Sequence, residues 1–226
     1  MHRRILVITG ASRGLGKQLA RHYVGAGYTV IGCSRSLPDL HLAGFRPWQV
    51  DVTDEPAVKD LFRQLRHDYG KVDALINNAG VAAMNHSLLT PVNTFRQVLE
   101  VNVIGTFLFS REAAKVMQRA GGGRIVNLST VAVPLRLEGE AAYVASKAAV
   151  EYLTDVLAAE LAPFHITVNA VGPTPLRTDL TAAVPEEKMN ELLKRQVLPE
   201  YADFDDVANV IDFYLHPRSA GITAQH

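Results

Sequence analysis

The chain has 226 residues, enough for one well-buried α/β domain. Basic and acidic residues both number 23, and the formal net charge of +0 argues against a nucleic-acid or anionic-membrane surface. A single cysteine excludes a disulfide framework and fits a reducing cytoplasm, and no apolar run reaches membrane-spanning length. The eight histidines lack metal-ligand spacing, so we expect no metal site.

The first predicted strand, residues 5–8, is a continuous apolar run, typical of a strand buried on both faces of a parallel sheet. It leads into the glycine-rich turn TGASRGLG at residues 9–16 and then into a helical pattern. Such a turn lets the backbone approach a pyrophosphate, and the helix N-terminus offers amide donors. The sequence therefore predicts a dinucleotide site. Its expected residues in this turn are Gly10, Ser12, Arg13, Gly14, Leu15 and Gly16.

The second predicted strand, residues 29–33, is followed by Ser34 and Arg35. In dinucleotide folds an acidic residue at this strand end binds the 2′-hydroxyl of NAD, whereas a basic residue suits the 2′-phosphate of NADP. No carboxylate stands here, and the guanidinium groups of Arg35 and Arg13 can bind phosphate through a planar fork of donors. The sequence thus predicts NADP(H). The alternative is that Arg35 is only a solvated loop charge.

The spacing Thr-Gly-x-x-x-Gly-x-Gly departs from the common G-x-G-x-x-G and resembles the form found in short-chain dehydrogenases/reductases. The resemblance covers nearly the whole chain. It implies an α/β fold with a Rossmann-like, doubly wound parallel sheet, in a single domain spanning residues 1–226.

The third predicted strand, residues 48–50, leads to Asp51 and Val52. The resemblance implies that Asp51 contacts the adenine of the cofactor. A fourth strand, residues 74–76, leads into the family motif Asn-Asn-Ala-Gly at residues 77–80. This motif is expected to close the strand end over the adenine-ribose side, through Asn78, Ala79 and Gly80, and to stabilise the central sheet. An ordinary turn, which Asn and Gly favour, is the alternative.

Residues 91–118 form a long, mostly helical pattern that we expect to be interrupted at Gly105. Asn102 lies among apolar residues, and a buried amide must find hydrogen-bond partners. The resemblance implies that Asn102 stops regular helical bonding, and that its carbonyl holds a water linking the catalytic lysine to solvent. The helix around Phe107 resembles the one that pairs across the family's dimer interface; core packing within one subunit is the alternative.

A fifth strand, residues 124–128, is followed by Ser129 and Thr130. The family's catalytic serine lies thirteen residues before its tyrosine, and counting back from Tyr143 reaches Thr130. Thr130 keeps a hydroxyl that can donate to a substrate carbonyl, although its methyl group takes up space. We favour Thr130 as the functional hydroxyl, and a one-residue shift at the strand end would bring in Ser129 instead.

Tyr143 and Lys147 lie four residues apart in a predicted helix over residues 141–161, and therefore on one face. An ammonium near a phenol favours the phenolate, so we expect a lowered Tyr143 pKa and proton exchange near neutral pH. A partly exposed pair without function would show the same spacing, but the other motifs favour the catalytic interpretation. The resemblance implies that Tyr143 is the general acid and that Lys147 also binds the nicotinamide ribose.

The sixth strand, residues 166–171, leads to Pro173, and Thr178 falls where the family places a threonine touching the nicotinamide carboxamide. Thr174 replaces the family's usual glycine. Residues 180–199 are amphipathic and charge-rich, and we expect them to form a lid over the substrate. The lip at residues 133–140 carries large and charged side chains, which fits a charged or tethered substrate and a solvated loop equally well.

A further helix is predicted over residues 203–215, and the chain stops at residue 226, where family members usually continue into a last edge strand. We therefore expect that final strand to be missing, and the sequence leaves open whether this end is shortened.

Taken together, the motifs predict hydride transfer between NADP(H) and a carbonyl, with reduction of a 3-oxoacyl thioester as the first choice. A small ketone derived from a sugar or polyketide is close behind. A lapsed enzyme acting as an NADP-binding sensor or scaffold stays open. The expected catalytic residues are Asn102, Thr130, Tyr143 and Lys147. The expected partners are a free or carrier-tethered carbonyl substrate and a second copy of the chain, in a cytoplasmic homodimer or homotetramer, with neither nucleic acid nor membrane.

Overall fold

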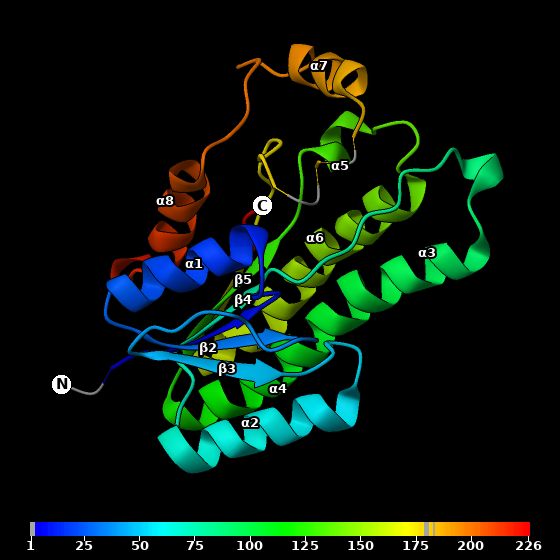
Figure 1. The fold of residues 1–226 in the computed structure, drawn as a ribbon. Helices are drawn as coiled ribbons and strands as arrows, with labels where there is room; N and C mark the ends of the chain where they lie inside the picture. Colours follow the sequence, from blue (N-terminus) through cyan, green and yellow to red (C-terminus); the bar gives the residue numbers. More distant parts are fainter. Residues whose placement is uncertain (1–2, 179–180, 183) are drawn as a thin grey trace.

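Six parallel strands form one sheet in the order β3-β2-β1-β4-β5-β6 (Figure 1). The computed structural model describes residues 3–178, 181–182 and 184–226. This strand order reverses direction between β1 and β4, as in doubly wound α/β folds, so the Rossmann-like prediction is confirmed. The strands are β1 (Ile5–Thr9), β2 (Thr29–Ser34), β3 (Phe45–Gln49), β4 (Ala74–Asn77), β5 (Gly123–Leu128) and β6 (Ile166–Val171).

Helices cover both faces of the sheet, which explains the continuous apolar runs in the strands (Figure 1). Successive residues of β1 point to opposite faces of the sheet and therefore enter different hydrophobic cores. Val7 packs on the face covered by α2 (Glu55–Tyr69), α4 (Gly105–Ala120) and α6 (Ala141–Leu161). Leu6 packs instead with α1 (Gly14–Gly25) and α8 (Phe204–Leu215). Both side chains are fully buried.

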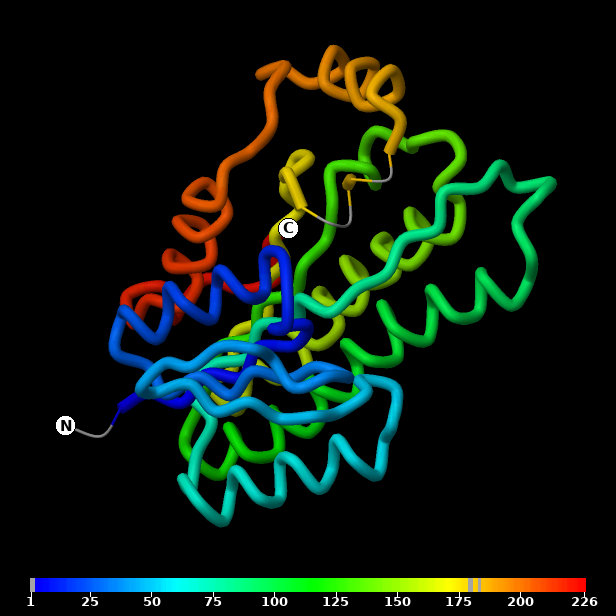
Figure 2. The backbone as a smooth tube through the Cα atoms, in the orientation of Figure 1, coloured from blue at the N-terminus to red at the C-terminus, as the bar shows by residue number. Residues whose placement is uncertain are grey.

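The remaining described elements lie around this three-layered body. Residues 180 and 183 of the predicted lid lie outside the described residues, and the described part contains α7, set apart from the sheet (Figure 2). Just after α7, the Arg195 guanidinium donates to the carbonyl of Leu135 at 2.5 Å, which ties the lid segment to the lip. These elements are η1 (Ser87–Leu89), α3 (Val92–Leu99), η2 (Glu100–Ile104), α5 (Ala132–Leu135), η3 (Ala162–Phe164), α7 (Glu186–Lys194) and η4 (Pro217–Ser219).

The predicted helix break at Gly105 was wrong in position. The irregular segment is the π-helical turn η2, and Gly105 is the first residue of α4. Gly105 serves packing instead, because an added Cβ would lie 2.7 Å from Cγ2 of Val52. The glycine therefore lets α4 approach the segment that follows β3.

The outer edge of β6 is covered by the last residues of the chain. No strand follows β6 in the described ranges, but the amide of Ala224 donates to Val168 O at 2.9 Å. The amide of Ala170 donates to Gln225 O at 2.7 Å, and the amide of Gln225 donates to Asn169 Oδ1 at 3.1 Å. These bonds satisfy edge groups that a seventh strand would otherwise pair.

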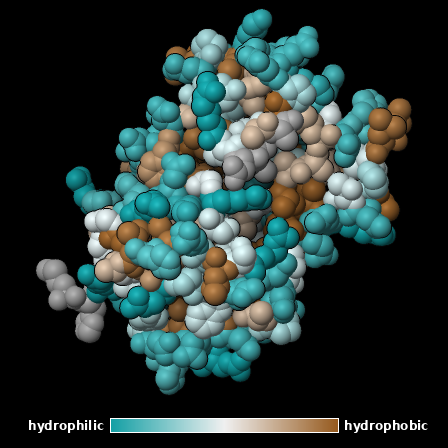
Figure 3. Space-filling model, viewed as in Figure 1, coloured by the Kyte–Doolittle hydropathy of each residue, from teal (hydrophilic) through white to brown (hydrophobic). Residues whose placement is uncertain are grey.

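The surface seen in Figure 3 is mostly hydrophilic, with apolar side chains gathered where η1 and the start of α3 project. Leu88, Leu89 and Val92 are exposed there and contribute nothing to the core. Among the helices of the described chain, none combines the length and apolar character that crossing a bilayer requires.

Candidate active site

The carboxyl ends of the central strands bring the predicted site residues to one edge of the sheet. Gly10 follows β1, Asn78 follows β4, Thr130 follows β5 and Pro173 follows β6. In open α/β sheets, ligands bind in the crevice at this edge, where the strand order reverses. The sheet order places that reversal between β1 and β4.

The glycine-rich turn needs its glycines for two different reasons. Gly10 has φ +69°, a conformation that disfavours a side chain, and an added Cβ would lie 2.9 Å from Ala79 Cα. A Cβ on Gly16 would lie only 2.3 Å from the carbonyl oxygen of Gly10. Gly14 also has a positive φ, and the atom nearest to an added Cβ there belongs to the side chain of Thr178. The glycines therefore let the turn close tightly, and at their positions no Cβ covers the backbone.

The Asn-Asn-Ala-Gly segment holds this turn in place. The Asn78 amide nitrogen Nδ2 donates to Thr9 O at 3.0 Å and to Gly10 O at 3.2 Å. The hydroxyl of Thr9 accepts in return from the backbone amides of Asn78 and Ala79. Ahead of it, Asn77 Nδ2 donates to Asn127 Oδ1 on β5 at 2.8 Å, so the motif also joins the central strands.

The turn and the start of α1 fit a dinucleotide. The first amides of a helix lack intrahelical partners and favour an anionic ligand, and the glycines leave no Cβ between that backbone and a pyrophosphate. Ser12, Gly14 and Leu15 are half-buried and Arg13 is exposed at this edge.

The predicted adenosine residues lie along the same edge, beyond β2 and β3. Ser34 is buried and its hydroxyl donates to the carbonyl of residue 36 at 2.7 Å, while Arg35 is exposed. One carboxylate oxygen of Asp51 accepts from the amide of Thr53 at 2.9 Å and from its hydroxyl at 2.8 Å. Asp51 therefore fixes its own turn, and Val52 beside it is buried.

Asn102 is fully buried and its side chain is hydrogen-bonded on both sides, as its sequence context predicted. Its Nδ2 donates to Val81 O and to Ser146 Oγ, both at 2.9 Å, and its Oδ1 accepts from Val81 N at 2.8 Å. Its backbone carbonyl accepts from the Thr106 hydroxyl at 2.7 Å. Asn102 thus joins η2, the segment after β4, and α6 next to Lys147.

Thr130, Tyr143 and Lys147 come together at the end of β5. The Lys147 ammonium donates to Leu128 O at 2.5 Å and lies 6.0 Å from the centre of the Tyr143 ring. The Thr130 hydroxyl acts on the Tyr143 phenol and favours its ionised form. An added Cβ on Gly80 would lie 3.6 Å from Lys147 Nζ and 3.4 Å from Asn102 Oδ1, so Gly80 lies next to both site residues.

The expected lowering of the Tyr143 pKa was wrong for this arrangement. Burial raises the pKa of the phenol to about 12, the Thr130 hydroxyl opposes that rise, and the charge of Glu140 adds to it. Burial also lowers the pKa of the Lys147 ammonium to about 8. Desolvation thus outweighs charge pairing, because it acts on both partners against their charged forms.

The family model described as short chain dehydrogenase matches residues 4–189. The chain belongs to this family. A short-chain type dehydrogenase/reductase of Picea abies is 34% identical over 98% of this chain and 89% of its own length. The 3-oxoacyl-[acyl-carrier-protein] reductase of Escherichia coli K12 is 28% identical over 98% of this chain and 93% of its own. The structure "ElxO with NADP Bound" superposes with a TM-score of 0.91 at 27% identity, covering 99% and 96% of the two chains.

Ser129 faces a different partner from its neighbour in this dehydrogenase fold. Ser129 is buried, and its hydroxyl donates to Glu151 Oε1 at 2.5 Å. Glu151 lies on α6, one turn after Lys147. Sequence reasoning did not find Glu151 or Ser146. The only available signal was helical spacing, since Glu151 lies four residues after Lys147 and Ser146 directly precedes it.

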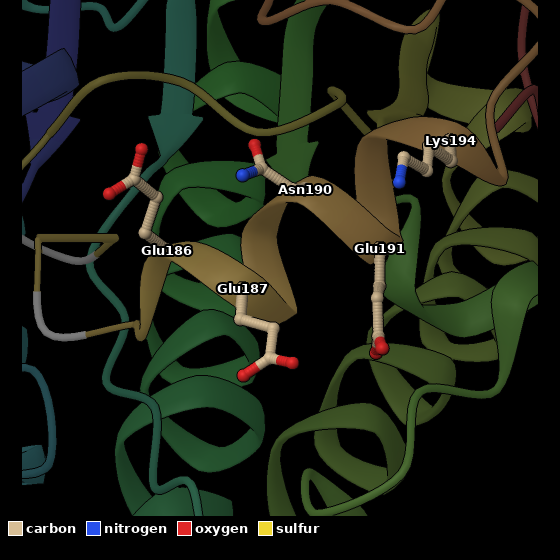
Figure 4. Close-up of a pocket in the computed structure, with 5 residues that line it drawn as sticks. All are labelled: Glu186, Glu187, Asn190, Glu191 and Lys194. Carbon is tan, nitrogen blue, oxygen red and sulfur yellow. The ribbon is translucent and has the colours of Figure 1, made fainter.

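The loop after β6 lies beside the glycine turn, as the family pattern predicts. The amide of Val131 donates to Pro173 O at 3.2 Å, and Thr178 is the nearest neighbour of an added Cβ on Gly14, at 3.9 Å. A separate hollow of about 440 Å³ runs along α7, and it contains none of the predicted catalytic or cofactor residues (Figure 4). Its lining side chains are Glu186, Glu187, Asn190, Glu191 and Lys194.

Proposed function

We propose that this protein reduces a carbonyl substrate with NADPH, using Tyr143 as the proton donor. The observation that carries the proposal is the meeting of Thr130, Tyr143 and Lys147 at the strand edge where the glycine turn lies. A 3-oxoacyl thioester is the preferred substrate class, in line with the name of the Escherichia coli relative. The buried thiol of Cys33 and the use of NADPH fit a reducing cytoplasm.

The side chains can divide the work of such a reduction. When bound, NADPH supplies the hydride. With its pKa near 12, Tyr143 holds its proton at neutral pH, which is the form that a general acid needs. Thr130 would donate to the carbonyl oxygen as its negative charge develops. Lys147, charged below pH 8, would stabilise the phenolate left behind, and Asn102 would hold η2 against α6 beside it.

The proton-donor role is tested by Tyr143→Phe. We expect a loss of about 10²–10⁴-fold in kcat, the usual contribution of general acid catalysis, with NADPH affinity nearly unchanged. The measurement is NADPH oxidation over a panel of 3-oxoacyl thioesters and small ketones, alongside cofactor fluorescence titration. The matched control is Tyr214→Phe, a half-buried tyrosine on α8 outside the site. Full turnover in the Tyr143 variant would mean that the proton comes from elsewhere.

The NADP(H) preference is proposed on the basic residues Arg13 and Arg35 and the missing carboxylate after β2. Charge-assisted hydrogen bonds contribute about 1.5–3 kcal/mol each, so Arg35→Ala should weaken NADPH about 10- to 100-fold and NADH hardly at all. Arg13→Ala should act in the same direction, and Arg21→Ala, an exposed arginine of α1, is the control. Equal losses for both cofactors would refute the assignment.

We also propose a homo-oligomer, built on an apolar stripe of α4 and α6. Phe107 lies on this stripe, and the helix around it resembles the family's dimer helix. The exposed apolar side chains of the stripe are Phe107, Tyr152 and Val156, and Ile104 at the end of η2 is exposed as well.

A further inference from the structure

Three consecutive residues at the end of β5 interact with one face of α6. Tyr143, Lys147 and Glu151 follow one another at intervals of four, so they share that face. The three contacts are Thr130 with the Tyr143 phenol, Leu128 O with the Lys147 ammonium, and the Ser129 hydroxyl with the Glu151 carboxylate. The first two belong to the proposed reaction, whereas the third has no role in it so far.

The Ser129–Glu151 contact is a strong local restraint. The hydroxyl–carboxylate distance is 2.5 Å, in the range of charge-assisted bonds, and Ser129 is 5% exposed. The backbone amide of Ser129 donates to Val171 O at 2.8 Å, so the residue is still held in the sheet. Main chain and side chain of Ser129 are therefore fixed from two elements, β6 and α6.

Thr130, the next residue, has less freedom than an ordinary loop residue. Its hydroxyl accepts from the amide of Ala132 at 3.2 Å. Its backbone rests on Gly172, where an added Cβ would approach the Thr130 backbone to 3.3 Å. The orientation of the Thr130 hydroxyl is thus set by the segment it belongs to, and that segment is fastened to α6 through Ser129.

We propose that Glu151 is a positioning residue, which holds Ser129 and thereby directs the Thr130 hydroxyl toward Tyr143. The proposal rests on the proposed function, in which Thr130 binds the carbonyl oxygen. It assigns the buried hydroxyl of Ser129 to orientation, and the hydroxyl of Thr130 to the substrate. Small misplacements of such a donor can cost up to about 10²-fold in rate.

Glu151→Leu removes the acceptor. We expect kcat for the acetoacetyl thioester of N-acetylcysteamine to fall about tenfold, with the NADPH dissociation constant within about twofold of wild type. Glu151→Gln keeps an oxygen acceptor and should retain activity within about threefold. Glu160→Leu, an exposed glutamate on the same helix, is the matched control and should leave kcat unchanged.

A double-mutant cycle separates positioning from general stability. Once Thr130→Val has removed the hydroxyl, adding Glu151→Leu should cost less than about twofold further, because the residue through which Glu151 acts is gone. A second loss of about tenfold in that background would overturn the proposal. An equal loss in Glu151→Gln and Glu151→Leu would do the same.

A readout without turnover keeps this test apart from the test of the reaction. Crystal structures of Glu151→Leu and Ser129→Ala should show the Thr130 side chain rotated away from Tyr143. An unchanged Thr130 rotamer in both would overturn the positioning role. A wild-type protein that reduces none of the panel substrates would overturn the proposed function, and the rotamer result would still decide the role of Glu151.

Discussion

At the scale of single side chains, the buried charge of Lys147 lowers stability, although the proposed reaction needs it. Lys147 is 5% exposed, and burial lowers the pKa of its ammonium from the usual 10.5 to about 8. Below pH 8 both the folded and the unfolded chain bind this proton, and the folded state then carries the cost of a buried charge. Between pH 8 and 10.5 the unfolded chain binds more protons, so this group's contribution to stability rises with pH.

Lys147→Met should therefore stabilise the protein at pH 7 while removing turnover. The pKa shift corresponds to at most about 3 kcal/mol, and the carbonyl of Leu128 would lose its donor at a cost of about 1 kcal/mol. We expect a rise in Tm of about 2–6 °C at pH 7. The rise should shrink toward pH 10.5. A lower Tm at pH 7 would contradict the assignment of a buried charge.

The same group predicts the pH dependence of reduction. Tyr143 keeps its proton up to about pH 12, so the loss of the Lys147 charge is the first change as pH rises. The kcat/KM of reduction, which reports the free enzyme, should be level below pH 8 and fall about tenfold per unit above it. Lys147→Arg, whose side chain stays charged, should remove that break if it remains active. A profile level to pH 10 would contradict the prediction.

At the scale of elements, a buried polar ladder joins the central strands to two helices. Asn127 on β5 is fully buried; it accepts from Asn77 Nδ2 and donates to Thr154 Oγ1, both at 2.8 Å. Asn77 Nδ2 also donates to Ser110 Oγ on α4. Buried polar groups of this kind are costly to leave without a partner.

Asn127→Leu should cost about 2–3 kcal/mol in the free energy of unfolding, because it strips a partner from both Asn77 and Thr154. Urea unfolding at pH 7 measures the effect. Asn209→Leu, an exposed asparagine on α8, is the control and should stay within about 0.5 kcal/mol of wild type. A loss no larger than that of the control would show that the ladder adds nothing to stability.

Element bounds set by local pattern were predictable, and those set by tertiary contacts were not. The sequence predicted residues 166–171 as β6 and residues 141–161 as α6, both as found, because apolar runs and breakers mark their ends. The third strand was expected at residues 48–50 and instead begins at Phe45, which is buried under α1 and pairs with Val30. The family resemblance placed irregular helical bonding at Asn102, where η2 lies, whereas the break expected at Gly105 was misplaced.

The same distinction between local sequence pattern and tertiary contacts applies to the site residues. Tyr143 and Lys147 could be paired from helical spacing and Thr130 from the family resemblance, and the structure does bring the three together. The direction of the Tyr143 pKa could not, because it depends on how deeply the phenol is buried. Glu151 could not either, since nothing in the sequence pairs it with Ser129.

At the scale of the whole molecule, the described chain covers both faces of its sheet but leaves apolar surface on the two neighbouring helices α4 and α6 (Figure 1). Tyr152 and Val156 lie four residues apart on α6, and they are 75% and 53% exposed. Phe107 on α4 is exposed as well, with the Arg111 guanidinium 5.4 Å from its ring centre. Exposed apolar side chains gathered on neighbouring helices mark an association surface more often than a solvated one.

Val156→Asp should therefore break this interface, converting a dimer to monomers or a tetramer to dimers. An unpaired carboxylate in an apolar interface costs several kcal/mol, more than a typical association can lose at micromolar concentration. Analytical ultracentrifugation of wild type and variant measures the change. Val197→Asp, an exposed valine after α7, makes the same substitution outside the stripe and should leave the assembly intact. A wild-type monomer, or a variant that sediments as the wild type does, would remove α4 and α6 as the interface.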